Sequence, residues 1–461
     1  MVTIQPAKSI EGKTELPSSP DLLFLALLAS CASSVPLKIP NIKTTQQISD
    51  LKSAISGHVD IECNQDTWSV KPVTEDPSLL LKVPDYFWPY RDMILFLALG
   101  MGKTVLFSNL TPERITNWHN QAQKLGITLK NVSIEDKTAL QLSEYDLGKT
   151  FDKNVIEEDT GPLLAFLLGS KQKHNFNVSY YISNPLRHLA QFLGYELSIK
   201  SLQNEADDPI ARRMRFLQQK RKGGGGQKLS YAVTADFTVT KKDSEVEIVL
   251  PGDETLSSIL ITAKSLIPKD SFVLANVPLE PWATQLFAFL RKMGTKLTIQ
   301  ESSRTAFGSA GLVSIQKANL SGKKMRCSPL FQFSAHLPSM LILASFSEKQ
   351  SVFRELEDMR MDTPDGIDLL ESCIRKLGAR HGEMPDGIVL EGARQFDGFD
   401  LTEALPAHIA AAFSIAGLRC IGETSINEEK ILKRWPDFFE LLNQVCQFRT
   451  DTEKKQRKEK K

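Results

Sequence analysis

The stretch Asp270–Ile299, DSFVLANVPLEPWATQLFAFLRKMGTKLTI, contains one complete strand–helix–strand unit. A short apolar strand, Ser271–Leu274, leads into a turn that contains two prolines. Apolar side chains then recur at 3- and 4-residue spacings, which places them on one face of a helix: Trp282, Leu286, Phe289, Leu290 and Met293. Gly294 can adopt the left-handed conformation that ends a helix, and Thr295–Ile299 alternates as a half-buried strand does.

The same order of helix, glycine and strand recurs along the chain. The glycines at the other junctions are Gly57, Gly126, Gly194 and Gly378. A last helical segment, Trp435–Val445, ends without a glycine. Copies separated by roughly 70–100 residues imply one supersecondary unit that is used about six times. Because each unit contains strands and helices of its own, we expect an α/β protein.

Composition limits the possible functions. The chain has 461 residues, enough for two domains, and 41% hydrophobic and 24% charged residues are ordinary for a globular protein. A formal net charge of +1 creates no general attraction for nucleic acid or for an anionic membrane. The six cysteines are scattered without metal-ligand spacing, which favours free thiols in a reducing cytoplasm. We expect no metal ion and no cofactor.

Two local patterns resemble functional motifs. The apolar run Leu22–Ala29 is too short to span a bilayer, so we expect a buried helix over Leu22–Ser33. Gly100–Thr104, GMGKT, resembles the end of a phosphate-binding loop. That motif needs a strand before it and a helix after it, whereas the pattern here predicts the reverse order. We therefore expect no phosphate-binding loop.

Two charged segments interrupt the pattern. Residues 205–228 include Gly223–Gly226, and four successive glycines are costly in a helix or strand, so a flexible loop is expected. Seven basic residues and no acid lie between Arg212 and Lys228, a composition that can bind a phosphate backbone. With one aromatic among them a solvated loop is favoured, and a nucleic-acid partner is not expected. Residues 447–461 are expected to form a disordered basic tail.

Four segments resemble the 5-enolpyruvylshikimate-3-phosphate (EPSP) synthases, which belong to the enolpyruvate transferases. They are Ile10–Ser30, Pro251–Leu297, Asp358–Gly392 and His408–Leu442. The resemblance implies a two-lobed inside-out α/β barrel built from six βαβαββ units, with helices inside and sheets outside. It also implies that the chain crosses between the lobes twice. Lobe one would then comprise residues 1–18 plus 248–446, and lobe two residues 19–247.

The family transfers the enolpyruvyl group of phosphoenolpyruvate to a hydroxyl group of shikimate 3-phosphate. Two highly anionic ligands must be held by lysines and arginines, and carboxylates must move protons to and from a tetrahedral intermediate. The resemblance therefore implies specific charged residues at a small set of positions. Those positions decide whether the activity is expected here.

Most of these positions hold other residues. The lysine and arginine of the family's first motif correspond to Pro20 and Leu25, and a further arginine falls near Leu95. The family's DELP, KESDR and DHR motifs correspond to Ala335-His336-Leu337-Pro338, Asp362-Thr363-Pro364-Asp365-Gly366 and Pro406-Ala407-His408. The residues that match the family as remnants of substrate binding are Ser183, Asp253, Asp365 and Lys433.

These replacements predict a non-catalytic protein. Five or more missing charge-assisted contacts at about 1.5–3 kcal/mol each remove about 7 kcal/mol or more of binding, some five decades of affinity. We therefore expect a pseudoenzyme with a binding or regulatory role, whose partner is a small anionic metabolite between the lobes or a protein. One alternative is a divergent 3-phosphoshikimate 1-carboxyvinyltransferase that uses His336, Asp362, Asp365, His408 and Lys433. Another is an RNA-associated protein that binds through residues 212–228.

Overall fold

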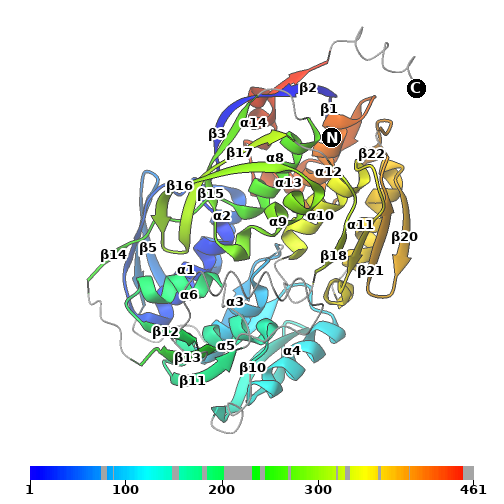
Figure 1. Ribbon diagram of the computed structural model, residues 1–461. Coiled ribbons are helices and arrows are strands. Elements are labelled where there is room, and N and C mark those ends of the chain that lie inside the picture. Colours follow the sequence, from blue (N-terminus) through cyan, green and yellow to red (C-terminus); the bar gives the residue numbers. More distant parts are fainter. Residues whose placement is uncertain are drawn as a thin grey trace.

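The structure, a computed structural model, describes residues 1–73, 80–86, 88–147, 155–178, 184–201, 231–238, 244–267, 271–317, 320–327, 333–361, 365–393 and 395–449. Within these residues the strands form seven sheets, and six of them share one plan. Five of the six combine a parallel strand pairing with antiparallel pairing, and in the sixth the parallel contact is an isolated bridge between Val155 and Val178. The six-unit α/β architecture predicted from the recurring junctions is therefore confirmed (Figure 1).

Three of these units are formed by residues that follow the first crossing of the chain. Their helices are α1 (Pro20–Ser33), α2 (Gln46–Ile55), α3 (Arg91–Gly100), α4 (Pro112–Lys124), α5 (Glu157–Gly169) and α6 (Pro185–Phe192). Their strands are β4 (Leu37–Ile39), β5 (Val59–Asn64), β6 (Thr67–Pro72), β7 (Leu80–Val83), β8 (Thr104–Phe107), β9 (Ile127–Ile134), β10 (Lys137–Tyr145), β11 (Lys173–Val178), β12 (Glu196–Ser201), β13 (Tyr231–Asp236) and β14 (Val246–Glu247). The sheets have the strand orders β14-β4-β6-β5, β7-β8-β10-β9 and β11-β13-β12.

The other three units combine the N-terminus with the C-terminal half. Their helices are α8 (Glu254–Leu266), η2 (Pro281–Ala283), α9 (Gln285–Met293), α10 (Phe333–Ser345), η3 (Glu357–Met361), α11 (Gly366–Leu377), α12 (Ala407–Arg419), α13 (Glu429–Arg434) and α14 (Phe438–Val445). Their strands are β1 (Val2–Ile4), β2 (Ala7–Ile10), β3 (Gly12–Glu15), β15 (Phe272–Pro278), β16 (Lys296–Thr305), β17 (Gly308–Lys317), β18 (Lys324–Arg326), β19 (Ser351–Arg354), β20 (Arg380–Met384), β21 (Gly387–Glu391), β22 (Asp400–Leu401), β23 (Thr424–Ile426) and β24 (Cys446–Phe448). The sheet orders are β16-β17-β15-β3, β18-β19-β21-β20 and β1-β23-β22, with a separate β2-β24 pair.

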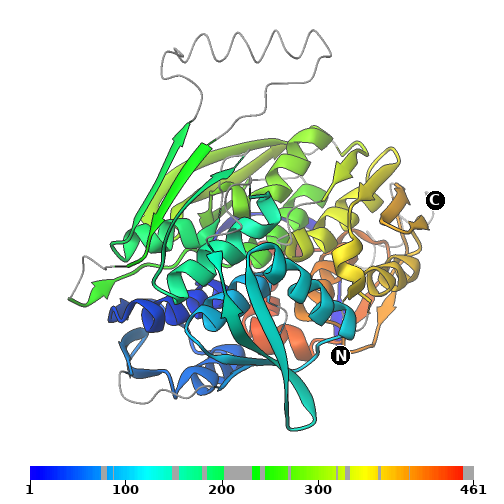
Figure 2. The same cartoon turned by 90° about the horizontal axis from the view of Figure 1, so that it is seen from below.

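Helices fill the interior of each half. Helices α1, α3 and α5 contact one another, as do α8, α10 and α12. Their sequences are apolar nearly all round, as in the LLFLALLA run of α1, and such helices are stable only when they are surrounded by protein. Amphipathic helices such as α9 and α11 pack on strands, α9 on β16 and α11 on β20 and β21, and keep one face exposed (Figures 1 and 2). Helices inside and sheets outside are the arrangement that the resemblance implied.

The buried apolar side chains form two cores. One gathers residues from Ile4 to Leu16 and from Leu256 to Cys446, and the other gathers residues from Leu22 to Leu250. Trp282, Ala283, Ala306 and Phe307 also join the second core. We use lobe one for residues 1–18 plus 248–446, and lobe two for residues 19–247. None of the described helices is both long and apolar enough to cross a membrane.

Four of the five glycines predicted to end a helix adopt the expected conformation, and one does not. Gly126, Gly194, Gly294 and Gly378 have φ values of +71°, +97°, +104° and +83°, the left-handed conformation expected of them. Gly57 is an exception, because α2 ends through a right-handed Ser56 and the amide of His58 bonds back to the carbonyl of Ile55.

The C-terminal segment also differs from its prediction. The last helix begins at Phe438 rather than at Trp435. Gln447 and Phe448, assigned to the disordered tail, lie in β24, because Phe448 pairs with Ala7 at the N-terminus. The rest of the predicted tail from residue 450 lies outside the described residues, as does the glycine-rich loop 205–228.

Candidate functional site

The two segments that link the lobes lie side by side. Ser18 and Gly252 form an antiparallel bridge, and the amide of Asp253 donates to the carbonyl of Pro17 at 2.9 Å. A Cβ atom on Gly252 would lie 2.4 Å from the Cβ of Leu16 and 2.5 Å from the carbonyl oxygen of Asn276, so only glycine fits. Helices α1 and α8 begin directly after these segments. Their N-termini, which attract negative charge, therefore meet at the boundary between the lobes.

An arginine from the end of α13 binds the carboxylates at both helix starts. Arg434 Nη2 lies 2.5 Å from Asp21 Oδ2 and 3.2 Å from Asp253 Oδ2, and all three side chains are buried. Asp253 also caps α8, since its Oδ1 accepts from the amides of Thr255 and Leu256. Trp435 Nε1 donates to Asp253 Oδ2 at 3.0 Å. The junction thus carries its own anions and its own cation.

Glu254, the third carboxyl group at the junction between the lobes, has different hydrogen-bond partners. Tyr90 Oη, at the start of α3, donates to Glu254 Oε1 at 2.9 Å, and Ser19 Oγ lies 3.1 Å from Glu254 Oε2. Burial, together with the charges of Asp21 and Asp253, raises the pKa of Glu254 to about 8. We use junction cluster for this set of side chains: Ser19, Asp21, Tyr90, Asp253, Glu254, Arg434 and Trp435.

A second ion-pair group joins the lobes at η3. Arg114 is 2% exposed, and its Nη1 lies 2.5 Å from Asp358 Oδ1 while its Nη2 lies 2.6 Å from the Asp358 carbonyl oxygen. Arg91 Nη2 lies 3.3 Å from Asp358 Oδ2. Thr111, the N-cap of α4, donates to the carbonyl of Met361 at 2.7 Å. Burial works against ionisation, but Arg114 and Arg91 hold the pKa of Asp358 below its ordinary value.

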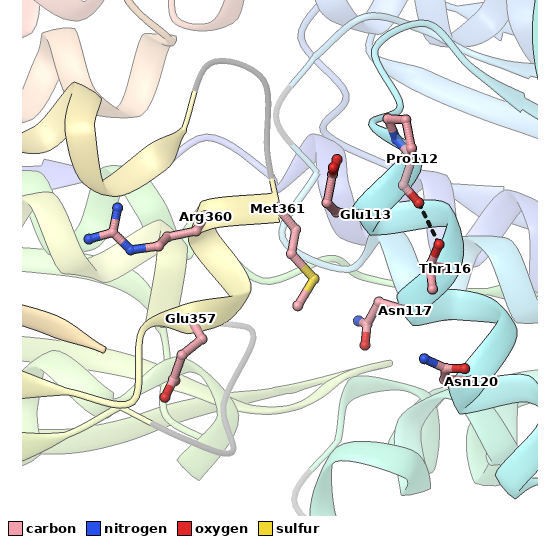
Figure 3. A pocket seen from close by; sticks show the side chains of 8 residues that line it. All are labelled: Pro112, Glu113, Thr116, Asn117, Asn120, Glu357, Arg360 and Met361. Atoms are coloured by element: carbon pink, nitrogen blue, oxygen red, sulfur yellow. Dashed lines mark hydrogen bonds between the residues drawn. The ribbon is translucent and has the colours of Figure 1, made fainter. Parts of the chain in front are cut away.

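An open groove of about 540 Å³ runs beside this contact (Figure 3). It lies between α4 of lobe two and η3 of lobe one. Arg360, on its wall, is engaged by Asp365 at 3.2 Å, by Asp368 at 3.4 Å and by Glu383. The residues that line the groove are Pro112, Glu113, Thr116, Asn117, Asn120, Glu357, Arg360 and Met361.

Two buried histidines lie close to the junction cluster. His336 Nδ1 forms a hydrogen bond with Ser258 Oγ, one turn along α8 from Glu254. Burial lowers the pKa of His336 to about 4, with Asp253 opposing, and burial with the charge of Arg434 lowers the pKa of His408 to about 3. Both imidazoles are therefore neutral at neutral pH. Neither can supply the positive charge that a phosphorylated ligand needs.

The residues predicted as remnants of the site do not converge. Asp253 lies in the junction cluster, whereas Asp365 caps α11, where its Oδ1 accepts from Ile367 N at 2.8 Å. Lys433 forms a solvent-exposed pair with Glu429 at 2.8 Å. Ser183 lies outside the described residues.

The positions where family residues are replaced are mostly in the interior. Pro20, Leu25 and Ala335 are buried in α1 and α10, and Leu95 is buried in α3. Gly366 is the first residue of α11, where a Cβ would approach the Met359 carbonyl oxygen to 3.0 Å. Asp362 and Thr363 lie outside the described residues. Within the described residues no group of histidine, cysteine and carboxylate side chains is arranged to hold a metal ion.

The charged groups that actually meet at the lobe boundary were missed from the sequence. They are Asp21, Arg91, Arg114, Glu254, Asp358 and Arg434. One signal was present: Asp21 and Arg91 stand at the starts of helices that are largely apolar after their second residue, where an unneeded charge would be costly. Such a charge indicates a partner elsewhere in the chain.

Comparison with known proteins gives a partial sequence match and a nearly complete fold match. Residues 226–442 match the family model described as EPSP synthase (3-phosphoshikimate 1-carboxyvinyltransferase). The 3-phosphoshikimate 1-carboxyvinyltransferase of Koribacter versatilis is 27% identical over 206 residues, 44% of this chain and 48% of that protein. Its counterpart in Synechococcus elongatus is 24% identical over 199 residues, 43% of this chain and 44% of that protein. The chain thus spans about half the length of the curated relatives it matches.

Solved structures extend the likeness to both lobes at the level of the fold. EPSP synthase from Acinetobacter baumannii superposes with a TM-score of 0.66 at 16% identity, covering 96% of this chain and 98% of that one. The enolpyruvyl transferase NikO from Streptomyces tendae gives a TM-score of 0.62 at 14% identity, covering 97% and 98%. The first 225 residues, which the family model does not match, therefore share the architecture.

Proposed function

We propose that this chain, a member of the EPSP synthase and enolpyruvate transferase family, does not transfer enolpyruvyl groups and acts instead as a binding or regulatory protein. One observation carries the proposal. In the part of the chain that the structure describes, arginines at the lobe boundary are engaged by carboxylates of the chain itself, Arg91 and Arg114 by Asp358, and Arg434 by Asp21 and Asp253.

The electrostatics of the boundary support this proposal. A phosphorylated substrate needs cations whose charge is available to it. To reach Arg114, it would have to displace a carboxylate that makes charge-assisted hydrogen bonds, each worth about 1.5–3 kcal/mol. Asp21 lies in the first turn of α1 and Asp253 is the N-cap of α8, so both take up the favourable field of the helix N-termini. The boundary is therefore balanced without a ligand.

The internal ion pairs at the lobe boundary also indicate which kind of partner the chain binds. A small anionic metabolite would compete with Asp358 and gain little, whereas a protein can bind the outer surface without disturbing the internal ion pairs. We therefore favour a protein partner for the regulatory role. We also place the chain in the cytoplasm, a reducing compartment, because all six of its cysteines are free thiols.

A divergent 3-phosphoshikimate 1-carboxyvinyltransferase is the second candidate, and two observations favour it. The curated relatives named above carry that name. In addition, Glu254 combines a pKa of about 8 with a place at the lobe boundary, and a carboxyl group that is neutral at pH 7 can act as a general acid. This candidate requires the Asp358 contact to open when substrate binds.

Genetic complementation separates the two candidates. The chain is expressed in a bacterial strain that lacks EPSP synthase, on medium without aromatic amino acids, with the A. baumannii enzyme as the positive control. The proposal predicts no growth although the chain accumulates in folded form. Growth at a rate near that of the control would establish the transferase. Expression of the Asp358→Asn variant in parallel tests whether the internal ion pair is what prevents activity.

A further inference from the structure

We propose that the junction between the lobes depends on a proton: the Glu254 carboxyl group holds one when the lobes are joined, and its ionisation weakens their contact. This inference concerns the junction cluster as a conformational device and is independent of whether the chain turns over a substrate. It rests first on where Glu254 lies, then on the charges around it.

Glu254 connects the two lobes directly. It is the first residue of α8, immediately after the second crossing of the chain. Its two carboxyl oxygens contact residues of lobe two, Ser19 at the first crossing and Tyr90 at the start of α3. Tyr90 in turn packs edge-on against Trp282 of lobe one, with the ring centroids 6.1 Å apart. A change in the charge of this one group therefore acts on both crossings and on an interlobe aromatic contact.

The cluster contains more carboxyl groups than cations. Among its described residues three carboxyl groups surround one guanidinium, and Arg434 Nη2 donates to Asp21 and to Asp253. Glu254 is met by two hydroxyl groups instead. A third full negative charge at 1% exposure would be costly, because neither hydroxyl group brings a compensating charge. One proton retained in the cluster removes that cost, and Glu254 is where it is held.

The charged and titratable groups on the elements packed around Glu254 support the placement of the proton on this carboxyl group. The titratable and charged groups that face it are Asp21 on α1, Tyr90 on α3, Asp253 on α8, His336 on α10 through Ser258, His408 on α12 through Arg434, and Arg434 on α13. Both histidines are neutral, and burial raises the pKa of Tyr90 well above its ordinary value. They therefore add no charge near neutral pH. Burial raises the pKa of Asp21 to about 6, so it ionises before Glu254 as the pH rises.

The direction of the pH effect follows from linkage. The pKa of Glu254 is about 8 in the folded chain, against an ordinary value of 4.5. The folded state therefore binds more protons than the unfolded state between these values, and stability falls as the pH rises through that range. The contribution of Glu254 is fully present below about pH 4.5 and is lost by the time the pH passes about 8.

Infrared spectroscopy can detect the proton itself. Difference spectra of the full-length protein between pH 7, where Asp21 is already ionised, and pH 9.5 should show loss of the carbonyl stretch of a protonated carboxylic acid. The band should be absent from Glu254→Gln, which keeps the side-chain shape and its hydrogen bonds. Glu371→Gln is the matched control, since Glu371 is a carboxyl of lobe one with a raised pKa that lies outside the junction cluster. Retention of the band in Glu254→Gln would overturn the assignment.

The effect on the lobes is measured by the distance between two spin labels. One label is placed on Cys63, exposed on β5 of lobe two, and the other on an Arg326→Cys substitution at an exposed position on β18 of lobe one. Between pH 7 and pH 9.5 the distance distribution should lengthen or broaden in the wild-type background and stay unchanged in Glu254→Gln. An identical pH response in both backgrounds would contradict the proposal.

Discussion

The guanidinium of Arg114 donates both to a carboxylate oxygen and to the main-chain carbonyl of Asp358. Arg114 and Asp358 are 244 positions apart and belong to different lobes. This pairing does two things at once. It joins the lobes without a ligand, and it neutralises a buried cation at the boundary where a phosphorylated substrate would bind. The proposed lack of activity and this contact between the lobes therefore have one physical cause.

Replacing Asp358 should destabilise the chain measurably. Asp358→Asn leaves Arg114 buried without its ionised partner, and breaking a buried pair costs about 3–5 kcal/mol. Since the Asp358 side chain is 43% exposed, screening should reduce the loss to about 1–3 kcal/mol. Denaturant-induced unfolding measures this loss as a decrease in the free energy of unfolding. The control is Asp386→Asn, whose pair with Arg354 at 2.6 Å is more exposed, and equal losses in the two variants would contradict this account of the Asp358 contact.

Replacing Arg434 should reduce stability much more than replacing its neighbour Lys433. Arg434→Ala leaves Asp21 and Asp253 buried without their cation, a loss of about 3–5 kcal/mol. Lys433→Ala removes an exposed pair with Glu429 and should cost at most about 0.5 kcal/mol. Thermal unfolding of the two variants under one buffer condition is a direct comparison. Comparable losses at positions 433 and 434 would mean that the buried cluster does not hold the junction together.

Acid should weaken the chain through its buried histidines. The pKa values of His336 and His408 are about 4 and about 3 in the folded chain, against 6.5 ordinarily. At these two groups the unfolded state therefore binds more protons below pH 6.5, and their contribution to stability should fall as the pH drops from 6.5 towards 4 and 3. Above about pH 4.5 the contribution of Glu254 changes in the opposite direction, so the histidine effect is read from the difference between wild type and variant. Unfolding midpoints of the wild type and of His336→Gln across this range test the point. The variant should show a shallower fall, and a fall as steep as that of the wild type would exclude His336 as a cause.

The close approach of the two crossing segments makes Gly252 irreplaceable. Gly252→Ala would place a methyl group 2.5 Å from the carbonyl oxygen of Asn276, which is main chain and cannot rotate away. Overpacking of this kind typically costs about 1–3 kcal/mol. Gly382→Ala, on β20, meets nothing within 4 Å and is the control. Denaturant midpoints should separate the two variants, and a neutral Gly252→Ala would show that the crossing segments can move apart freely.

Periodicity alone was enough to predict the repeated unit, because the apolar spacing and the terminal glycines of helices such as α9 and α11 are local features. The junction was not predictable in this way. Arg434 meets Asp21 at a separation of 413 positions, and Arg91 meets Asp358 at 267, so no local pattern links them. Gly57 failed for the opposite reason, since the helix before it ends in a right-handed turn that does not need glycine.

The resemblance to a family likewise predicted the fold better than it predicted the charged residues at the lobe boundary. Pro20, Leu25 and Ala335, which the resemblance placed at charged positions of the family, are buried in helices. The resemblance gave no weight to Glu254, although this residue directly follows Asp253, because only Asp253 matched the family. Only the three-dimensional arrangement shows that the two neighbouring carboxyl groups have different partners.

The most direct test of the central claim is a transfer assay with purified chain. Phosphoenolpyruvate and shikimate 3-phosphate are supplied together at saturating levels for the A. baumannii enzyme, and inorganic phosphate and the enolpyruvyl product are both quantified. The account predicts no product above the level without protein, at enzyme concentrations comparable to substrate. Stoichiometric release of phosphate with product over many turnovers would contradict it.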